Sequence, residues 1–562
     1  MNDTTHLNRR QFMNVTGQAA TSSPSVSAVA PAILSAESPA QTMDLGARAG
    51  YLFNVVAPAP GVKVAAAGDI CQPHPKKGVE RSLKFAFVVV AFCLLASAVQ
   101  FAVAAAQPNI IYFLADDLGW TDVGWHGSEI KTPNLDKLAN GGAKLEQFYV
   151  LPVCSPTRAA LLTGRYPIRH GLQVGVVRPW AQYGLPLDER TLPQALREAG
   201  YTTHLSGKWH LGHFQPDYLP TRRGFDTQYG HYNGAIDYFT HQRDGGHDWH
   251  RNDKETRDEG YTTSLLGAEA VRVVEQAQPG KPFFLYVPFN APHTPLQAPD
   301  EYLKRYAHIT HKKRQAFAAM VECLDEQVGR VVAALEKRGL TENTLIIFSS
   351  DNGGMEIEVG GATNGKLRAQ KGTLYEGGTR VCAFANWPGH IKPGTVVNEP
   401  LHIVDWFPTL VNLSGGSLQQ KHPLDGRDIW PVVTSGKPSP HEDILINAMP
   451  NSGAIRMGGW KLVLNGHITA NDLENAGAPK TGAPKAAPRN KQTSEKTAAS
   501  SVELFNLAED PSEQNNLAAQ NPEVVQQLRA RLEAYRAAAV PPKAEDQPVN
   551  YKAPRVWGQS GQ

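Results

Sequence analysis

Two pairs of oxygen-bearing side chains follow short apolar runs in this chain. Asp116 and Asp117 come after one run, and Asp351 and Asn352 come after another. Oxygen ligands from two strand ends suit a hard divalent cation such as Ca²⁺, which takes about six to eight of them. Without a cation, three carboxylates packed together would repel one another and some would take up a proton. Either pair alone is better explained as a cap on a helix or turn, so a metal site depends on the two pairs meeting.

A cysteine stands at the start of a helix-like run. Cys154 is followed by Ser-Pro-Thr-Arg and then by the segment AALLTGR, which places it near a helix N-terminus. Anions and activated nucleophiles are stabilised at such an end. A lone cysteine is more often a buried apolar residue. Its neighbours in the folded protein must therefore decide whether Cys154 is a nucleophile or a core residue.

Four further side chains carry positive charge or protons. Lys208 and His210 lie in the segment GKWHLG, His293 follows a proline, and Lys371 precedes a Glu-Gly-Gly sequence. Taken singly, each lysine is typical of a solvated surface and each histidine of a structural hydrogen bond. Taken together, they suit the binding and protonation of a tetrahedral oxyanion.

The elements that must position these residues alternate between strands and helices. Residues 109–115, 283–289 and 344–350 are short β-branched and aromatic runs, typical of buried strands. Apolar residues spaced i, i+3, i+4, i+7 over 317–335 predict an amphipathic helix that stops at Gly339. Such alternation predicts a mostly parallel sheet covered on both faces.

A second helix is predicted at 192–199, followed by a strand at 201–206. Ligands of such sheets bind beyond the carboxyl ends of the strands. Asp116 and Asp351 stand at that position. The predicted fold class is therefore α/β.

Composition narrows the classes of protein. The chain has 562 residues, with 55 Lys plus Arg against 53 Asp plus Glu, so its near-neutral charge gives no support for a nucleic-acid binder. Hydrophobic residues make up 41%, which is enough for a large core. Five cysteines exclude a disulfide scaffold. A mean hydropathy of −0.35 and one long apolar run exclude a polytopic membrane protein.

Several long motifs together resemble the sulfatase family. CSPTRAALLTGRYP matches the signature C-x-P-x-R…LTGR, and GKWHLG matches the family's second signature. The DD and DNGG pairs and KGTLYEGG complete the pattern in the family's order, and the resemblance covers about 107–517. Within the family the chain looks most like the arylsulfatase B or N-acetylgalactosamine-4-sulfatase group, through PLDERTLPQALREAGYTTHLSGKWHLG and LPTRRGFDTQYG.

The resemblance implies an alkaline-phosphatase-like sulfatase fold, with a large mostly parallel mixed sheet flanked by helices and a smaller C-terminal antiparallel sheet plus helix. It also implies that a separate maturation enzyme oxidises Cys154 to Cα-formylglycine. One hydroxyl of the hydrated aldehyde, bound to Ca²⁺, would attack sulfur in line. Arg158 would hold the formylglycine in place. The implied calcium ligands are Asp116, Asp117, Cys154 as formylglycine, Asp351 and Asn352.

The remaining roles also follow from the resemblance. Lys208, His293 and Lys371 would bind the sulfate oxygens, and His293 would donate a proton to the leaving alcohol. His210 would deprotonate the second hydroxyl, which expels sulfate and restores the aldehyde. The expected substrates are aryl sulfates or sulfated sugars, such as N-acetylgalactosamine 4-sulfate.

Two rival functions remain at this point. One is a hydrolase of phosphonate monoesters or phosphodiesters from the same superfamily, with the same metal ligands and nucleophile. The other is a non-catalytic, Ca²⁺-dependent binder of sulfated glycans whose Cys154 is never converted. The set of lysines and histidines argues against the binder, because binding alone needs no paired acid and base.

The front of the chain carries targeting features. Residues 79–106 have a basic flank, an apolar run and an Ala-Ala-Ala end, which together predict a cleaved signal peptide. This predicts export to the periplasm or the medium and no stable membrane span in the mature form; an uncleaved anchor is the alternative. Residues 1–78 form an atypical leader with a twin-arginine-like start. We expect translation to start near Val79, and a genuine long leader is the alternative.

The body divides into a catalytic domain at 107–435 and a C-terminal subdomain at 436–545. A low-complexity insert at 476–501 is expected as a surface loop within one hairpin. Cys323 and Cys382 are expected as two separately buried thiols, with pairing as the alternative. Some aromatic and basic side chains in loop-like stretches have open roles in substrate binding or in packing: Trp180, Tyr183, Tyr238, Trp249, Arg222 and Arg223.

Overall fold

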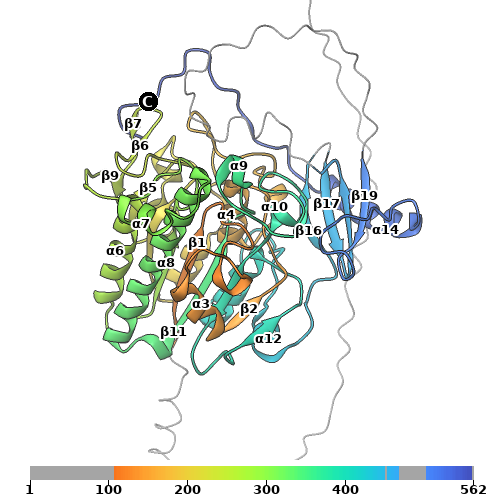
Figure 1. The fold of residues 1–562 in the computed structure, drawn as a ribbon, viewed down its shortest axis with the longest axis horizontal. Coiled ribbons are helices and arrows are strands. Elements are labelled where there is room, and N and C mark those ends of the chain that lie inside the picture. The colour runs from red at the N-terminus through yellow and green to blue at the C-terminus, as the bar shows by residue number, and fades with distance from the viewer. Residues whose placement is uncertain (1–106, 450–451, 467–500, 560–562) are drawn as a thin grey trace, which may run out of the picture. The chain divides into compact units, whose positions relative to one another are not determined.

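The computed structural model describes residues 107–449, 452–466 and 501–559 (Figure 1). The predicted leader and signal peptide, and almost all of the low-complexity insert, lie outside the described residues. Within the described part of the chain, no helix is long and apolar enough to cross a membrane.

A ten-stranded mixed sheet forms the centre of the catalytic domain, in the order β14-β2-β13-β11-β1-β10-β4-β5-β8-β9. Its five central strands run parallel to one another. These are β11 (Thr344–Ser350), β1 (Asn109–Ala115), β10 (Phe283–Pro288), β4 (Thr202–Lys208) and β5 (Thr227–His231). The outer strands are β14 (Thr395–Val397), β2 (Ala143–Leu145), β13 (Ala383–Asn386), β8 (His250–Arg251) and β9 (Lys254–Glu255). The predicted mostly parallel α/β architecture is confirmed.

The sheet is covered on both faces, which explains why its central strands are apolar throughout. All seven residues of β1 are buried. Ile110 and Tyr112 enter one hydrophobic core, whereas Ile111 and Phe113 enter the other. Successive side chains of a strand point to opposite faces, so a strand between two helical layers needs apolar residues at every position.

One face is covered by α3 (Pro133–Asn140), α6 (Thr262–Glu275) and α8 (Lys312–Arg338), seen together in Figure 1. The other face packs against α4 (Cys154–Thr163), α5 (Leu192–Glu198) and α11 (Trp406–Leu413). The helix predicted over 317–335 is confirmed as the core of α8. It ends at Gly339, whose φ of 64° is the left-handed conformation of a helix C-cap.

Short elements connect these layers. The short helices are α7 (Asp300–Arg305), α9 (Ile357–Gly360), α10 (Glu376–Thr379) and α12 (Trp430–Ser435). A three-stranded sheet joins β12 (Arg380–Val381), β3 (Phe148–Tyr149) and β15 (Leu401–His402). A small hairpin consists of β6 (Gln242–Arg243) and β7 (Gly246–His247).

The C-terminal subdomain is a four-stranded antiparallel sheet with one helix. Its strands, in order, are β16 (Ile444–Ala448), β17 (Gly453–Met457), β18 (Trp460–Leu464) and β19 (Val502–Asn506). Helix α14 (Pro522–Ala537) buries Leu528 and Leu532. Because β18 pairs with β19, the insert does fall within one hairpin, as predicted.

The chain after α14 runs back over the catalytic domain, as the dark blue trace in Figure 1 shows. Val540 N donates to Ile168 O at 2.9 Å, and Trp557 N donates to His247 O at 2.9 Å. The subdomain boundary predicted at 545 falls inside this segment. Nothing in the local sequence pattern indicated that the last residues lie against β7.

The cysteines match their expected state. Among the described residues, Cys154, Cys323 and Cys382 are free and buried. Cys323 lies on α8, and Cys382 lies between β12 and β13. The expectation of separately buried thiols is confirmed.

Candidate active site

The ends of four neighbouring strands bring the predicted side chains together. In the register of β1 with β11, Ala115 lies opposite Ser350, so Asp116 and Asp351 leave the sheet side by side. Lys208 is the last residue of β4, which ends two residues beyond the strand end predicted at 206. His293 lies in the loop that follows β10. All of these strands are parallel, so their carboxyl ends meet at one edge of the sheet.

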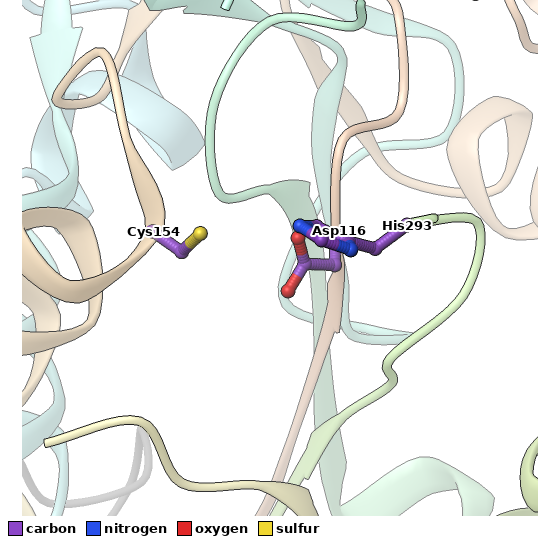
Figure 2. Close-up of side chains that lie close together, drawn as sticks. All are labelled: Asp116, Cys154 and His293. Atoms are coloured by element: carbon purple, nitrogen blue, oxygen red, sulfur yellow. The ribbon is translucent and has the colours of Figure 1, made fainter. Parts of the chain in front are cut away.

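Helix α4 presents the cysteine to this edge. Cys154 is its first residue, after the extended Val153, and all ten residues of the helix are buried. Figure 2 shows the sulfur of Cys154 directed toward Asp116 and His293. The candidate ligand atoms of these three residues lie within 4.8 Å of one another. Arg158 follows one helical turn after Cys154 and so faces the same side.

A carboxylate cluster lies beside the cysteine. The candidate ligand oxygens of Asp116, Asp117 and Asp351 lie within 4.8 Å of one another. Asn352 Nδ2 donates to Asp117 Oδ1 at 2.8 Å. Three buried oxygens have no hydrogen-bond partner within the described part of the chain: Asp116 Oδ1, Asp117 Oδ2 and Asn352 Oδ1. Buried polar atoms are rarely left unpaired, and an all-oxygen set is what a hard cation takes. The residues therefore fit a divalent cation.

Positive side chains surround the carboxylates. Arg158 Nη2 donates to Asp116 Oδ2 at 2.7 Å and to Asp351 Oδ2 at 2.9 Å, and all three side chains are fully buried. Lys208 Nζ also contacts Asp116 Oδ2. Burial raises the pKa of Asp116, but the charges of Lys208, His293 and Arg158 outweigh it and hold the pKa well below its usual range. Burial and the charge of Asp116 raise the pKa of Asp351 to about 7.

The two histidines form hydrogen bonds through different ring nitrogens. His293 Nδ1 lies 2.6 Å from Thr294 O, and its Nε2 lies 3.6 Å from Asp117 Oδ2. His210 Nε2 lies 3.1 Å from Val177 O, and its buried Nδ1 has no partner among the residues that the structure describes. A carbonyl only accepts, so His293 carries a proton on Nδ1 and His210 on Nε2. Burial lowers the pKa of His293 to about 4. Burial and the charge of Lys208 lower the pKa of His210 well below its usual range.

A pocket opens over these groups. Cys154, His210, His293 and Lys371 line it, and Lys371 Nζ lies 2.6 Å from Asp117 Oδ1. Two arginines that sequence analysis missed, Arg178 and Arg243, also line it. They lie in a loop and in the β6–β7 hairpin, where no motif or periodicity marks them.

The open roles of the loop aromatics and arginines are now decided for some residues. Tyr238 and Trp249 are 0% exposed and belong to the core, so a stacking role on a sugar is wrong for them. Arg223 is buried and donates to the carbonyls of Leu185 and Glu189, so it is structural. Arg222 is exposed and lies 3.6 Å from Asp253. Trp180 and Tyr183 are half-buried.

Comparison with known proteins decides the family. Residues 108–416 match the family model for sulfatases, and residues 439–561 match the model for the C-terminal region of aryl-sulfatase. The chain belongs to the sulfatase family. It is 41% identical to arylsulfatase J of Mus musculus over 467 residues, which covers 78% of this chain and 77% of that protein. It is 36% identical to human arylsulfatase A over 470 residues, covering 78% and 89%.

Solved structures agree with this assignment. The structure of Ps i-CgsB in complex with k-i-k-neocarrahexaose superimposes on the sulfatase with a TM-score of 0.67 and 34% identity, covering 78% of this chain and 94% of that one. The sulfatase is therefore a sulfuric ester hydrolase with the expected fold. The particular likeness to arylsulfatase B stays a prediction.

Proposed function

We propose that this sulfatase hydrolyses sulfate monoesters of sugars or aryl alcohols with a nucleophile derived from Cys154. The observation that carries the proposal is the position of Cys154. It begins a buried helix, faces Asp116 and His293, and lies beside an all-oxygen cluster with unpaired atoms. A sulfate ester bound there would meet a nucleophile, positive charge and a proton donor together.

The thiol itself is poorly suited to the reaction. Burial raises the pKa of Cys154 to about 11, so it is a protonated thiol near neutral pH and a weak nucleophile. This supports oxidation of Cys154 to formylglycine, whose hydrate supplies one hydroxyl to attack sulfur and a second to release the sulfate. Since Cys154 is 2% exposed, the maturation enzyme must act before the chain has folded.

Asp116, Asp117, Asp351 and Asn352, with the converted Cys154, would hold Ca²⁺. When bound, this ion lowers the pKa of an oxygen attached to it and balances the charge of the carboxylates. The absence of nitrogen or thiolate ligands among the four residues favours a hard ion over zinc.

The surrounding side chains divide the remaining work. Lys208 and Lys371 bind the sulfate oxygens and offset their charge. His293 gives a proton to the leaving alcohol from Nε2, because its Nδ1 is committed to Thr294 O. An anionic substrate beside Nε2 favours the protonated imidazole. His210 accepts a proton at Nδ1, the nitrogen left without a partner. Arg158 positions Asp116 and Asp351 and is not itself a proton carrier.

The phosphonate-hydrolase alternative shares this fold. The phosphonate monoester hydrolase of Agrobacterium radiobacter superimposes with a TM-score of 0.53 at 19% identity, which is a likeness of fold alone. Relative turnover of 4-nitrophenyl sulfate and an aryl phosphonate monoester separates the two functions. We expect the sulfate to be preferred, since this chain's family matches are to sulfatases.

The deciding experiment combines mass spectrometry with an activity assay. In the tryptic peptide 145–158 from the native host, conversion of Cys154 lowers the mass by about 18 Da. We expect the lighter peptide, or its hydrate, to dominate in protein that turns over 4-nitrophenyl sulfate. Only unmodified cysteine, in protein without turnover, would favour the glycan-binding alternative.

Export to the periplasm or the medium remains part of the proposal. The N-terminus of the exported protein tests it. We expect the chain to begin near residue 107, whereas an N-terminus before residue 79 would show that the leader is genuine.

A further inference from the structure

A second hollow lies beside the active-site pocket. The two share Pro179 in their walls. The second has a volume of about 410 Å³, within the range of sites for small molecules. Its walls come from two catalytic-domain loops and from residues 548–559 of the C-terminal segment. The segment that returns over the catalytic domain therefore reaches the edge of the active site.

Hydrogen bonds hold the C-terminal segment in this place. His247 N donates to Arg555 O at 2.9 Å, and Trp557 N donates to His247 O at 2.9 Å. Trp557 is 3% exposed, and its Nε1 donates to Arg243 O at 3.0 Å. Upstream, Trp180 Nε1 donates to the carbonyl of Glu545 at 3.0 Å. The hollow is therefore formed before any ligand binds, which lowers the entropy cost of binding.

Arg243 links the wall of the catalytic pocket to the wall of the second hollow. This arginine lines the catalytic pocket, while Trp557, which lines the second hollow, binds the arginine's own carbonyl. Tyr551 lines the second hollow, and its buried hydroxyl has no hydrogen-bond partner among the described residues. Burial raises the pKa of Tyr551. The nearby charge of Asp244 raises this pKa further, and that of Arg243 lowers it.

The lining suits a sugar that carries negative charge. Trp180, Phe214 and Tyr551 are half-buried, and the rings of Trp180 and Tyr551 meet edge to face at 5.6 Å between centroids. Aromatic rings offer an apolar face on which a sugar ring can stack. Lys552 and Arg555 are exposed at the rim and attract anions.

We propose that this hollow binds the saccharide residue next to the one that carries the scissile sulfate. This inference rests on the proposed function and specifies its substrate class. The sulfatase would act on sulfated oligosaccharide chains in preference to isolated sulfate esters. The C-terminal segment would supply part of the leaving-group site, with Lys552 and Arg555 facing a second anionic group on the chain.

Steady-state kinetics on the full-length, converted enzyme tests the inference. The substrates are 4-nitrophenyl sulfate and the disaccharides and tetrasaccharides of chondroitin 4-sulfate, ι-carrageenan and heparin. We expect at least one tetrasaccharide to have a clearly lower KM than its disaccharide. Trp180→Ala and Tyr551→Ala should each raise that KM by about 3- to 10-fold, the size of a lost aromatic contact. Their kcat and KM for 4-nitrophenyl sulfate should change by less than about twofold.

Matched variants control for general damage. Trp430→Ala removes a half-buried tryptophan of α12 that packs on Trp387 at 5.6 Å between centroids. It should leave the tetrasaccharide KM unchanged. Lys552→Ala should raise the tetrasaccharide KM and weaken its salt dependence, whereas Lys437→Ala, another exposed lysine, should do neither.

The outcomes separate the two proposals. The inference is wrong if the enzyme hydrolyses 4-nitrophenyl sulfate but no tetrasaccharide is preferred to its disaccharide. It is also wrong if Trp180→Ala and Tyr551→Ala impair both kinds of substrate equally while the variants melt within about 3 °C of wild type. If fully converted wild-type enzyme hydrolyses no sulfate ester at all, the proposed function itself fails and the inference falls with it.

Discussion

Lys461 and Glu376 form a buried ion pair between the C-terminal subdomain and the catalytic domain. Lys461 Nζ lies 2.9 Å from Glu376 Oε1, and both side chains are fully buried. The same ammonium lies 2.9 Å from Glu513 Oε1. Glu376 begins α10, directly after the loop that carries Lys371, so this pair connects β18 to the rim of the active site.

Removing the charge of Lys461 should strongly destabilise the protein. Lys461→Met would remove the ammonium that both buried carboxylates contact, and breaking a buried ion pair costs about 3–5 kcal/mol. The free energy of unfolding from urea denaturation measures the effect. Lys437→Met, at an exposed position, should change it by less than about 0.5 kcal/mol. A loss below about 1 kcal/mol for Lys461→Met would show that the pair is not important for stability.

Replacing the nucleophile should abolish turnover while the fold is retained. Cys154→Ala removes one small buried group, so we expect normal melting and no measurable hydrolysis of 4-nitrophenyl sulfate. Cys154→Ser should also be inactive, unless the host's maturation enzyme oxidises serine. Cys323→Ala is the matched control, because it removes another buried thiol, on α8, that does not line the active-site pocket. Near-normal turnover by Cys154→Ala would contradict the mechanism.

Removal of Ca²⁺ should lower both activity and thermal stability. Asp116, Asp117 and Asp351 repel one another when no cation lies between them. A ligand that binds only the folded state at about 100 times its Kd adds about 2.7 kcal/mol. We therefore expect chelation to lower the melting temperature and added Ca²⁺ to restore it. Asp117→Asn should weaken this response. A melting temperature independent of Ca²⁺ would exclude the ion from the cluster.

The role of His293 should depend on the leaving group. His293→Gln removes the proton donor but keeps a side chain able to hydrogen-bond. Turnover of a sugar sulfate should fall by about 10²–10⁴-fold, the usual contribution of a general acid. Turnover of 4-nitrophenyl sulfate should fall much less, because 4-nitrophenolate leaves without a proton. Equal losses on both substrates would indicate that His293 binds sulfate without donating a proton.

His441 should make stability depend on pH. Its Nε2 lies 2.8 Å from Asp405 Oδ1, and both side chains are buried. Burial lowers the pKa of His441, but the charge of Asp405 outweighs it, so the net pKa is raised above the usual 6.5. The folded state then binds this proton more tightly than the unfolded state. The stabilisation is complete below the unfolded pKa and is lost as the pH rises through the folded pKa.

Urea denaturation of His441→Gln at two pH values measures this contribution. The variant should be less stable than wild type by roughly 1.5–3 kcal/mol near pH 5.5, the range of a hydrogen bond to a charged group. The difference should shrink by pH 9. His308→Gln, at an exposed histidine, should show no such trend. A difference that grows with pH would reverse the assignment.

Local sequence determined the central strands, the long helix and the residues at their ends. The strands 109–115 and 344–350 were predicted to the residue, because a strand buried on both faces must be apolar at every position. Gly339 ended α8 as predicted, because glycine adopts the left-handed cap at little cost. Cys154 stands at the start of a helix, and the two acidic pairs stand at the ends of strands; the sequence pattern predicts all three positions.

Only the tertiary structure decided which loop residues reach the active site. Arg178 and Arg243 line the pocket, Trp249 is in the core, and Trp180 lies beside the hollow, although all four come from similar loop-like sequence. Residues 548–559 return to the catalytic domain, and Lys461 pairs with Glu376. No periodic pattern in the sequence predicts either contact. These contacts join residues far apart in the chain, and their free energy comes from burial and charge that appear only when the fold brings both partners together.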